Sequence, residues 1–151
     1  PEARFAVVGP APLDGSLKEL LDVGNVRFLG PKPHPEVPAW IKAMDVCLIP
    51  FKRNELARAA DPIKLYEYCA LGKPVVSTVR QDLPGDPAPV RIASSDEEFI
   101  AGVKSALAED DPTRRADRIA FAARHTWDRR ASDILAAVDL ALEAKGSGRR
   151  V

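Results

Sequence analysis

Apolar positions follow two periods along the chain, one typical of strands and one typical of helices. Short apolar runs bounded by glycine or proline predict strands at residues 4–8, 26–29, 45–49, 74–78 and 90–93. Apolar residues at helical spacing predict helices at residues 13–23, 35–44, 61–72, 94–107, 112–125 and 128–145. Residues 50–61 show no clear period, and residues 146–151 are predicted to form a loose tail.

The alternation of strands and helices predicts an α/β fold with a doubly wound parallel sheet. We find no internal repeat and no linker, so we expect one domain over residues 1–145. Ligands bind beyond the carboxyl ends of the strands in such sheets. Those ends lead here into residues 9–12, 30–34 and 50–61. The last segment is long, and long connections are often functional.

The amino-acid composition is typical of a globular protein, and the net charge bears on whether the protein binds nucleic acid. Of the 151 residues, 46% are hydrophobic and 29% are charged, and 22 basic residues balance 22 acidic ones. Zero net charge argues against nucleic-acid binding, which needs a basic field. Six late arginines are interleaved with acids and are predicted to form a solvated helix face: Arg114, Arg115, Arg118, Arg124, Arg129 and Arg130.

The two cysteines, Cys47 and Cys69, lie in apolar contexts and lack the spacing of metal ligands. We interpret them as reduced, buried thiols, which favours a cytoplasmic location. No apolar run approaches the length needed to span a membrane. His34, in a proline-rich loop, has no identifiable partner for base catalysis, and His125 is expected at the end of a helix.

The segment DPIKLYEYCALGKPVVST, residues 61–78, carries the clearest chemistry. Asp61 is predicted as the N-cap and Pro62 as the first helical residue, so the free N–H groups of the first turn face the ligand edge of the sheet. Such a helix tip is suited to phosphate. We expect one helix face, formed by Ile63, Tyr66, Cys69 and Ala70, to pack on the sheet, and the other to carry Lys64, Glu67, Tyr68 and Leu71.

Lys64 and Glu67 have two interpretations. Lys64 can add its cation to the amides that face an anion, and the Glu67 carboxylate, one turn on, can accept hydrogen bonds from the vicinal hydroxyls of a sugar. Alternatively, the two residues form a surface ion pair three positions apart, worth ~0.2–0.5 kcal/mol. Spacing alone does not decide between them.

The pattern P-x-K-L-Y-E-Y-x-A-x-G-K-P-V-V, residues 62–76, resembles the nucleotide-sugar-binding motif of group 1, family 4-like glycosyltransferases with the GT-B fold. These enzymes act in the biosynthesis of cell-wall and surface polysaccharides. Further segments fit in the same order: FAVVGP at 5–10, residues 25–51, NEL at 54–56 and TW at 126–127. The resemblance is strongest over residues 1–80 and extends more weakly to about residue 140.

The resemblance implies roles for individual residues. Glu67 matches the second glutamate of a paired-glutamate motif, which holds the nucleotide ribose. Lys64 and the amides after Asp61 match the segment near the donor diphosphate, while residues 30–34 match a loop at the nucleobase and residues 9–12 a loop at the donor cleft. The family commonly needs no metal and no cofactor. The donor-binding residues implied are Glu67, Lys64, Pro62, Ile63, Gly9, Pro10, Lys32 and His34.

Two departures from the family pattern stand out. Ala59 occupies the position of the first glutamate, eight residues before Glu67. Glu55 is a candidate to replace it; the alternative is a solvated loop acid. Near it, Asn54, Arg53 and Arg58 are candidates for the donor sugar or diphosphate, or are simply solvated. The second departure is that the family has a further strand and helix, and an N-terminal acceptor-binding domain, ahead of residues 5–10.

We therefore expect the donor-binding part of a larger glycosyltransferase. The resemblance implies transfer of a hexose from a nucleotide-diphosphate sugar to a saccharide or lipid-linked acceptor, with retention at the anomeric carbon. The partner would be the acceptor-binding domain, through which alone any peripheral membrane contact would be made. The chain by itself should have little or no transferase activity. A GT-B-fold nucleotide-sugar epimerase and a non-catalytic sugar-nucleotide-binding or interaction module remain alternatives, the latter because of Ala59.

Overall fold

The computed structural model describes residues 3–10, 18–78, 88–109 and 111–147. The chain divides into two compact units, Pro1–Trp40 and Ile41–Val151, which are described separately. All strand pairs in the described residues are parallel, and helices intervene between strands in both units. The predicted α/β fold class is confirmed, with its parallel strands arranged in two sheets.

The first unit contains a two-stranded parallel sheet. Strand β1 (Phe5–Val8) pairs with β2 (Val26–Gly30), with Phe5 opposite Val26 and an irregularity in register between Val7 and Val8. Helix α1 (Lys18–Leu21) precedes β2, and the earlier part of the helix predicted at 13–23 lies outside the described residues. A 3-10 turn, η1 (His34–Glu36), leads into α2 (Val37–Ala43).

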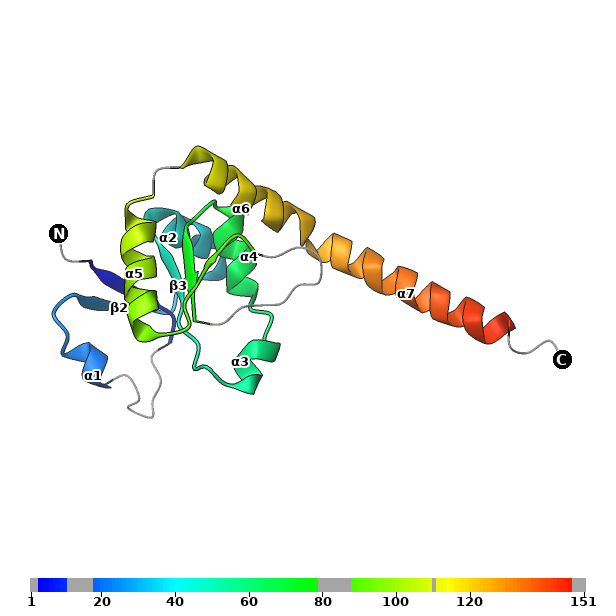
Figure 1. Cartoon of the computed structure of the whole chain (residues 1–151), viewed down its shortest axis with the longest axis horizontal. Coiled ribbons are helices and arrows are strands. Elements are labelled where there is room, and N and C mark those ends of the chain that lie inside the picture. Colours follow the sequence, from blue (N-terminus) through cyan, green and yellow to red (C-terminus); the bar gives the residue numbers. More distant parts are fainter. Residues whose placement is uncertain (1–2, 11–17, 79–87, 110, 148–151) are drawn as a thin grey trace. The chain divides into compact units, whose positions relative to one another are not determined.

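The second unit is built on a three-stranded parallel sheet in the order β3 (Cys47–Ile49), β4 (Val75–Ser77) and β5 (Arg91–Ile92). Helices α3 (Glu55–Ala59) and α4 (Ile63–Ala70) connect β3 to β4, and α5 (Asp96–Leu107) follows β5. Figure 1 shows α4 and α5 on either side of this sheet. Since a Cβ on Gly102 of α5 would lie 3.2 Å from Val76, alternation directs Val75 and Ser77 toward α4.

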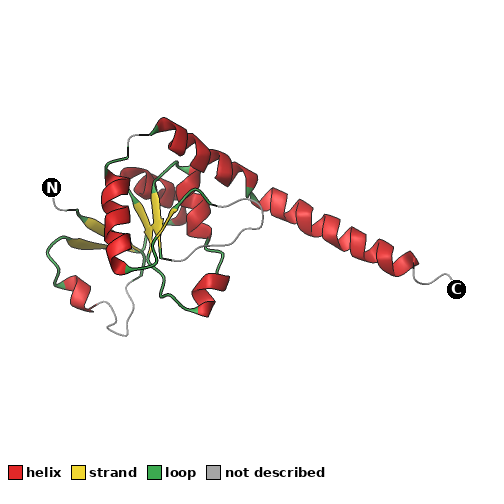
Figure 2. Cartoon of the chain, viewed as in Figure 1, coloured by secondary structure: helices red, strands yellow, loops and turns green. Residues whose placement is uncertain are grey.

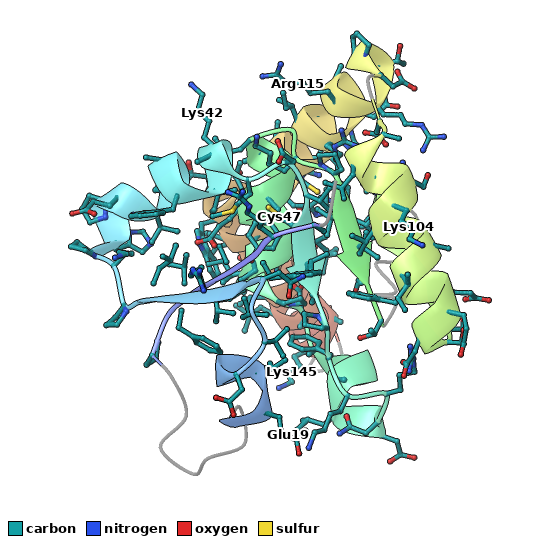
Figure 3. The ribbon with its side chains drawn as sticks, turned by 90° about the vertical axis from the view of Figure 1, so that its left-hand side faces the viewer. Glu19, Lys42, Cys47, Lys104, Arg115 and Lys145 are labelled. Atoms are coloured by element: carbon teal, nitrogen blue, oxygen red, sulfur yellow. The ribbon has the colours of Figure 1, made fainter. Side chains whose placement is uncertain are left out.

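The core of this unit lies between β4 and its covering helices. Leu65, Cys69 and Val76 are completely buried, and Val75 is 1% exposed. Figure 3 shows Cys47 in the interior among the strands, whereas Lys104 lies on the outer part of α5. The prediction that both cysteines are buried, free thiols is confirmed. Burial raises the pKa of Cys47 to about 11 and that of Cys69 to about 12, against the smaller opposing effects of Lys73 and Arg118 respectively.

The buried face of α4 differs from the predicted one. Leu65 and Cys69, four residues apart, form the stripe on the sheet, whereas Ile63 is 51% exposed and Ala70 is also exposed. The buried stripe differs from the predicted one because α4 packs on helix α6 (Pro112–Arg124) as well as on the sheet, and the two contacts use different residues of the helix. Tyr66 is half-buried and stacks on Phe121 rather than on the sheet, with ring centroids 5.8 Å apart.

Two further helices complete the second unit, α6 (Pro112–Arg124) and α7 (Trp127–Ser147) (Figure 2). Asp111 caps α6. At the start of α5, Ser95 Oγ accepts from the Glu98 N–H, and the Glu98 carboxylate accepts from the Ser94 N–H. The helix predicted at 128–145 is confirmed, and its apolar residues Ile134 and Val138 are 64% and 48% exposed. No helix among the described residues has the length and apolarity needed to cross a membrane.

Candidate functional site

The N-terminal end of α4 lies at the carboxyl edge of the three-stranded sheet. Helix α4 connects β3 to the parallel strand β4 and packs on both, so it must run back against the strand direction. Its first turn, with Ile63 and Lys64, therefore lies where β3 ends. This is the edge at which α/β sheets bind ligands, as the sequence predicts for this segment.

The first turn of α4 offers backbone donors without protein acceptors. The N-cap is Pro62, at φ −75° and ψ 121°, and no side chain caps the helix. The Leu65 N–H donates to the Pro62 carbonyl at 3.0 Å. The N–H groups of Ile63 and Lys64 have no acceptor within the part of the chain that the structure describes. An N-terminal helical turn in this state favours an anion.

Asp61 does not cap α4, and that prediction is wrong. Its carboxylate accepts hydrogen bonds from the Tyr66 hydroxyl at 2.6 Å and from Arg130 Nη2 at 2.7 Å. Two side-chain donors, one of them a charged guanidinium, thus occupy both oxygens of this carboxylate in place of the helix amides. Burial raises the pKa of Asp61, but hydrogen bonds from Tyr66 and Arg130 outweigh it, and the pKa lies below its ordinary 3.8. Burial, and then the bond to Asp61, raise the pKa of Tyr66.

Glu67 lies one turn behind the free amides. Its side chain is half-buried, and among the described residues it makes no hydrogen bond or ion pair. Lys64 is exposed in the first turn. The Lys64–Glu67 surface pair is absent from the ion pairs of the described residues. The carboxylate is thus neither sealed in the core nor neutralised by a neighbour, so its oxygens remain able to accept hydrogen bonds.

The segment between β3 and α4 contains the short helix α3, which the sequence pattern did not reveal. Asn54 is its N-cap, with Oδ1 accepting from the Ala57 N–H at 2.8 Å. Glu55 is exposed in its first turn, so the position is helical rather than a loop. The Asn54 cap is the one signal for α3, because five residues are too few to show a period.

Two arginines of this segment were also candidates. Arg53 forms an exposed ion pair with Asp96 of α5, with Nη1 and Oδ1 3.2 Å apart. Arg58 lies within α3, and its side chain lies outside the described residues. Ala59, at the position of the family's first glutamate, is the exposed last residue of α3.

The candidate residues of the first unit gather at the ends of β1 and β2. The Gly9 N–H donates to the Gly30 carbonyl at 3.0 Å, so the loops after the two strands are neighbours. Both glycines have positive φ, 140° and 68°, which other residues rarely adopt. Lys32 Nζ lies 4.8 Å from the centroid of the Trp40 ring, and His34 and Pro10 are exposed. Residues 11 and 12 lie outside the described residues.

The C-terminal end of α4 is closed by contrast. Gly72 has φ 68°, and the Gly72 and Lys73 N–H groups donate to the carbonyls of Cys69 and Tyr68, the pattern of a Schellman motif. Arg118 Nε donates to the Gly72 carbonyl at 3.0 Å. Arg118 is 3% exposed, so the prediction that it belongs to a solvated face is wrong.

Arg118 is buried because it has an acidic partner. Its Nη2 lies 2.7 Å from Glu109 Oε1, and Glu109 also pairs with Arg91. Burial raises the pKa of Glu109, but its hydrogen bonds with Arg91 and Arg118 outweigh burial and lower it below the ordinary 4.5. Only 5% of the Glu109 side chain is exposed, which marks this cluster as structural rather than as a ligand site.

Among the described residues, no three histidine, cysteine, aspartate or glutamate side chains gather as metal ligands. Among the described residues, the groups without a protein partner at this edge of the sheet are the backbone amides of Ile63 and Lys64, the Lys64 ammonium and the Glu67 carboxylate. Such a set can hold an anion next to a group that carries hydroxyls.

The comparisons with known proteins point to the same class as the motif at residues 62–76. The chain is 40% identical, over 80 residues, to the Bacillus subtilis (strain 168) protein named "Putative teichuronic acid biosynthesis glycosyltransferase TuaH". That match covers 52% of this chain and 20% of the relative, so the chain spans a minor part of that relative's length. The family model described as glycosyl transferases group 1 matches residues 1–123, most of the chain, and the predicted resemblance is confirmed. The chain belongs to the glycosyl transferases group 1 family.

Proposed function

We propose that this chain binds the nucleotide diphosphate of a sugar donor within a glycosyltransferase that moves a hexose to a saccharide or lipid-linked acceptor. The family match and the relative named for teichuronic acid biosynthesis support glycosyl transfer in polysaccharide synthesis. The observation that carries the proposal is the Glu67 carboxylate, which has no partner among the described residues and lies one turn behind amides that also have none there.

Glu67 would bind the ribose of the donor. Its two carboxylate oxygens can each accept a hydrogen bond from one of two neighbouring hydroxyls, and half-burial limits competition from water. Because no donor within residues 3–10, 18–78, 88–109 and 111–147 bonds to this carboxylate, a diol does not have to displace any of these groups.

The first turn of α4 would hold the diphosphate. The free N–H groups of Ile63 and Lys64 point along the helix axis, and the helix dipole adds partial positive charge. The exposed Lys64 ammonium supplies a full charge. When the bond between the anomeric carbon and the diphosphate oxygen breaks, negative charge grows on the leaving group, and the same donors stabilise it. We therefore propose a reaction without a metal or a cofactor. We also propose retention at the anomeric carbon, because the resemblance to the family implies it.

The remaining candidates receive their proposed roles from the resemblance to the family. We assign the nucleobase to the loop with Lys32 and His34, and the donor cleft to Gly9 and Pro10. Near α3, the exposed Glu55, four residues before Ala59, is the proposed replacement for the first glutamate. Asn54, Arg53 and Arg58 are proposed for the donor sugar or diphosphate, although Asn54 Oδ1 and the Arg53 guanidinium already have protein partners.

The full enzyme would contribute what this chain lacks. The acceptor would be bound by a domain outside residues 1–145, the whole would act in the cytoplasm, and the chain alone would transfer little or no sugar. Closure of two domains over the donor would exclude water from the reaction.

Isothermal titration calorimetry of this chain with ADP, CDP, GDP, UDP and dTDP tests the proposal. We expect one of them to bind, and Glu67→Ala to weaken that binding at least tenfold with the fold retained by circular dichroism. Asp117→Ala is the matched control, because Asp117 is an exposed acid of α6 and its removal changes the net charge equally. Absence of binding by the folded wild-type chain, or equal losses in both variants, would refute the donor site.

The exposed Ala59 favours the second candidate, a non-catalytic sugar-nucleotide-binding or interaction module, since no carboxylate stands at that position. A nucleotide-sugar epimerase would share the role of Glu67. Product analysis with the full-length protein separates the three, because only a transferase gives a glycosylated acceptor and only an epimerase gives an isomeric donor.

A further inference from the structure

A cluster from three elements lies beside the first turn of α4. Arg130 of α7 bonds to Asp61 at 2.7 Å, and its guanidinium lies 5.0 Å from the centroid of the Tyr66 ring. Tyr66 donates to Asp61 and stacks on Phe121 of α6. His125, after α6, packs on the Phe121 ring with centroids 4.6 Å apart. Two donors, the Tyr66 hydroxyl and the Arg130 guanidinium, thus fix the position of the Asp61 carboxylate.

This carboxylate is the group best placed to compete with a bound phosphate. Asp61 immediately precedes the N-cap Pro62, and an aspartate before proline commonly accepts a hydrogen bond from an N–H two or three residues later. For Asp61, those N–H groups belong to Ile63 and Lys64, which are free in this structure. A carboxylate bound there would cancel the attraction of the helix tip for an anion.

We propose that Arg130 is a positioning residue of the donor diphosphate site, which acts by holding the Asp61 carboxylate away from the first-turn amides of α4. The inference rests on the proposed function, because it assigns those amides to the diphosphate. Arg130 is suited to the task, since its planar guanidinium bonds Asp61 while stacking on Tyr66, and a lysine would not do both.

Without Arg130, Asp61 keeps one neutral partner, the Tyr66 hydroxyl. Two amides at a helix N-terminus are the better partner for an anion. We therefore expect Arg130→Ala to let Asp61 cap α4 and to weaken nucleoside diphosphate binding by about tenfold. Asp61→Ala in that background removes the competing acceptor and restores binding to within about threefold of wild type.

A double-mutant cycle separates this mechanism from simple loss of charge. We would measure the dissociation constant of the diphosphate that binds best for wild type, Arg130→Ala, Asp61→Ala and the double variant. Capture of the amides by Asp61 predicts that Asp61→Ala changes this constant little when Arg130 is present and about tenfold when Arg130 is absent. Equal effects in both backgrounds would show long-range Coulomb interactions alone and would overturn the inference.

Arg129→Ala is the matched control. Arg129 is the neighbouring arginine of α7 and pairs with Asp133 of the same helix at 3.1 Å, so its loss changes the charge without touching Asp61. We expect binding within about twofold of wild type. A loss as large as that of Arg130→Ala would contradict the assigned role.

A second measurement needs no nucleotide. In Arg130→Ala, the amide ¹⁵N–¹H resonances of Ile63 and Lys64 should shift as Asp61 titrates, and they should stay constant in wild type and in the double variant. The groups facing Asp61 are Tyr66, Arg130 and His125. Unchanged amide resonances in Arg130→Ala overturn the inference. Shifted amides without any binding to wild type refute the proposed function and leave the Asp61 movement established.

Discussion

The two ends of α4 contrast in how their backbone groups are satisfied. At the C-terminal end, Gly72 and Lys73 close a Schellman motif, and buried Arg118 binds the Gly72 carbonyl. At the N-terminal end, no side chain caps the helix, and the amides of Ile63 and Lys64 have no partner among the described residues. One eight-residue helix thus has one end built for stability and one end left open.

The contrast indicates where to look for function. A closed end contributes to the free energy of folding because its polar groups are satisfied without solvent or ligand. An open end loses that contribution and gains the ability to bind an anion. Substitutions at the closed end should therefore change stability, whereas substitutions at the open end should change binding and leave stability nearly unchanged.

The largest effect is expected at Glu109. Glu109→Ala leaves Arg118 buried without its carboxylate, 2.7 Å away in wild type, and unpairs Arg91. Breaking a buried ion pair in this way costs about 3–5 kcal/mol. Urea denaturation followed by far-UV circular dichroism measures the free energy of unfolding. A loss below about 1 kcal/mol would show that this cluster does not anchor α6 to α4.

Acid should reproduce part of this loss. The pKa of Glu109 is lower in the folded protein than its ordinary 4.5, so its ion pairs contribute stability above that pH and lose it as pH falls through the folded pKa. The pKa of Asp61 is likewise below its ordinary 3.8, so its bonds to Tyr66 and Arg130 also lose their contribution to stability as pH falls through the folded pKa. Unfolding measured from pH 7 to pH 3 should show wild type approaching Glu109→Gln at low pH. A stability difference that stays constant over this range would contradict the assignment.

Gly72→Ala should have an intermediate effect. The residue has φ 68°, and an added Cβ would lie 2.6 Å from Arg115 Cγ, which can move. The left-handed conformation then costs about 1–2 kcal/mol. Thermal unfolding measures it, with Gly102→Ala as a comparison in which φ is not positive and Val76 limits the space. If Gly72→Ala leaves the melting temperature unchanged, the C-terminal end of α4 does not require glycine at this position.

The smallest effect on stability belongs to the open end. Lys64→Gln and Glu67→Gln should each change the free energy of unfolding by less than about 0.5 kcal/mol, because neither side chain has a protein partner in the described residues. Both should weaken nucleoside diphosphate binding in calorimetry. A destabilisation of 2 kcal/mol in Glu67→Gln would reveal a structural role and weaken the contrast between the two ends.

The sequence predicted the bounds of α4 to within two residues, because the signals at both ends of this helix are local. Pro62 fixes its own φ and Gly72 allows a positive one, so both act without distant partners. The five predicted strands all form, with ends within two residues of the predicted ones. Their signal is also local, because each is a short apolar run bounded by glycine or proline. Helix α3 was missed because it spans five residues.

The errors arise from contacts between distant positions. Asp61 has the residue type and the position expected of an N-cap, but its carboxylate bonds to Arg130, 69 residues later. Arg118 reads as one of six solvated arginines, yet the fold buries it against Glu109. Neither pairing joins residues that are close in the sequence. The residue types identify the charged groups, but their spacing does not show which groups pair.

The most direct test of the central claim is a crystal structure of this chain with the nucleoside diphosphate that binds it most tightly. We predict ribose hydroxyls within hydrogen-bond distance of the Glu67 carboxylate and phosphate oxygens on the amides of Ile63 and Lys64. A nucleotide bound elsewhere on a folded chain, or one whose ribose points away from Glu67, would contradict the account.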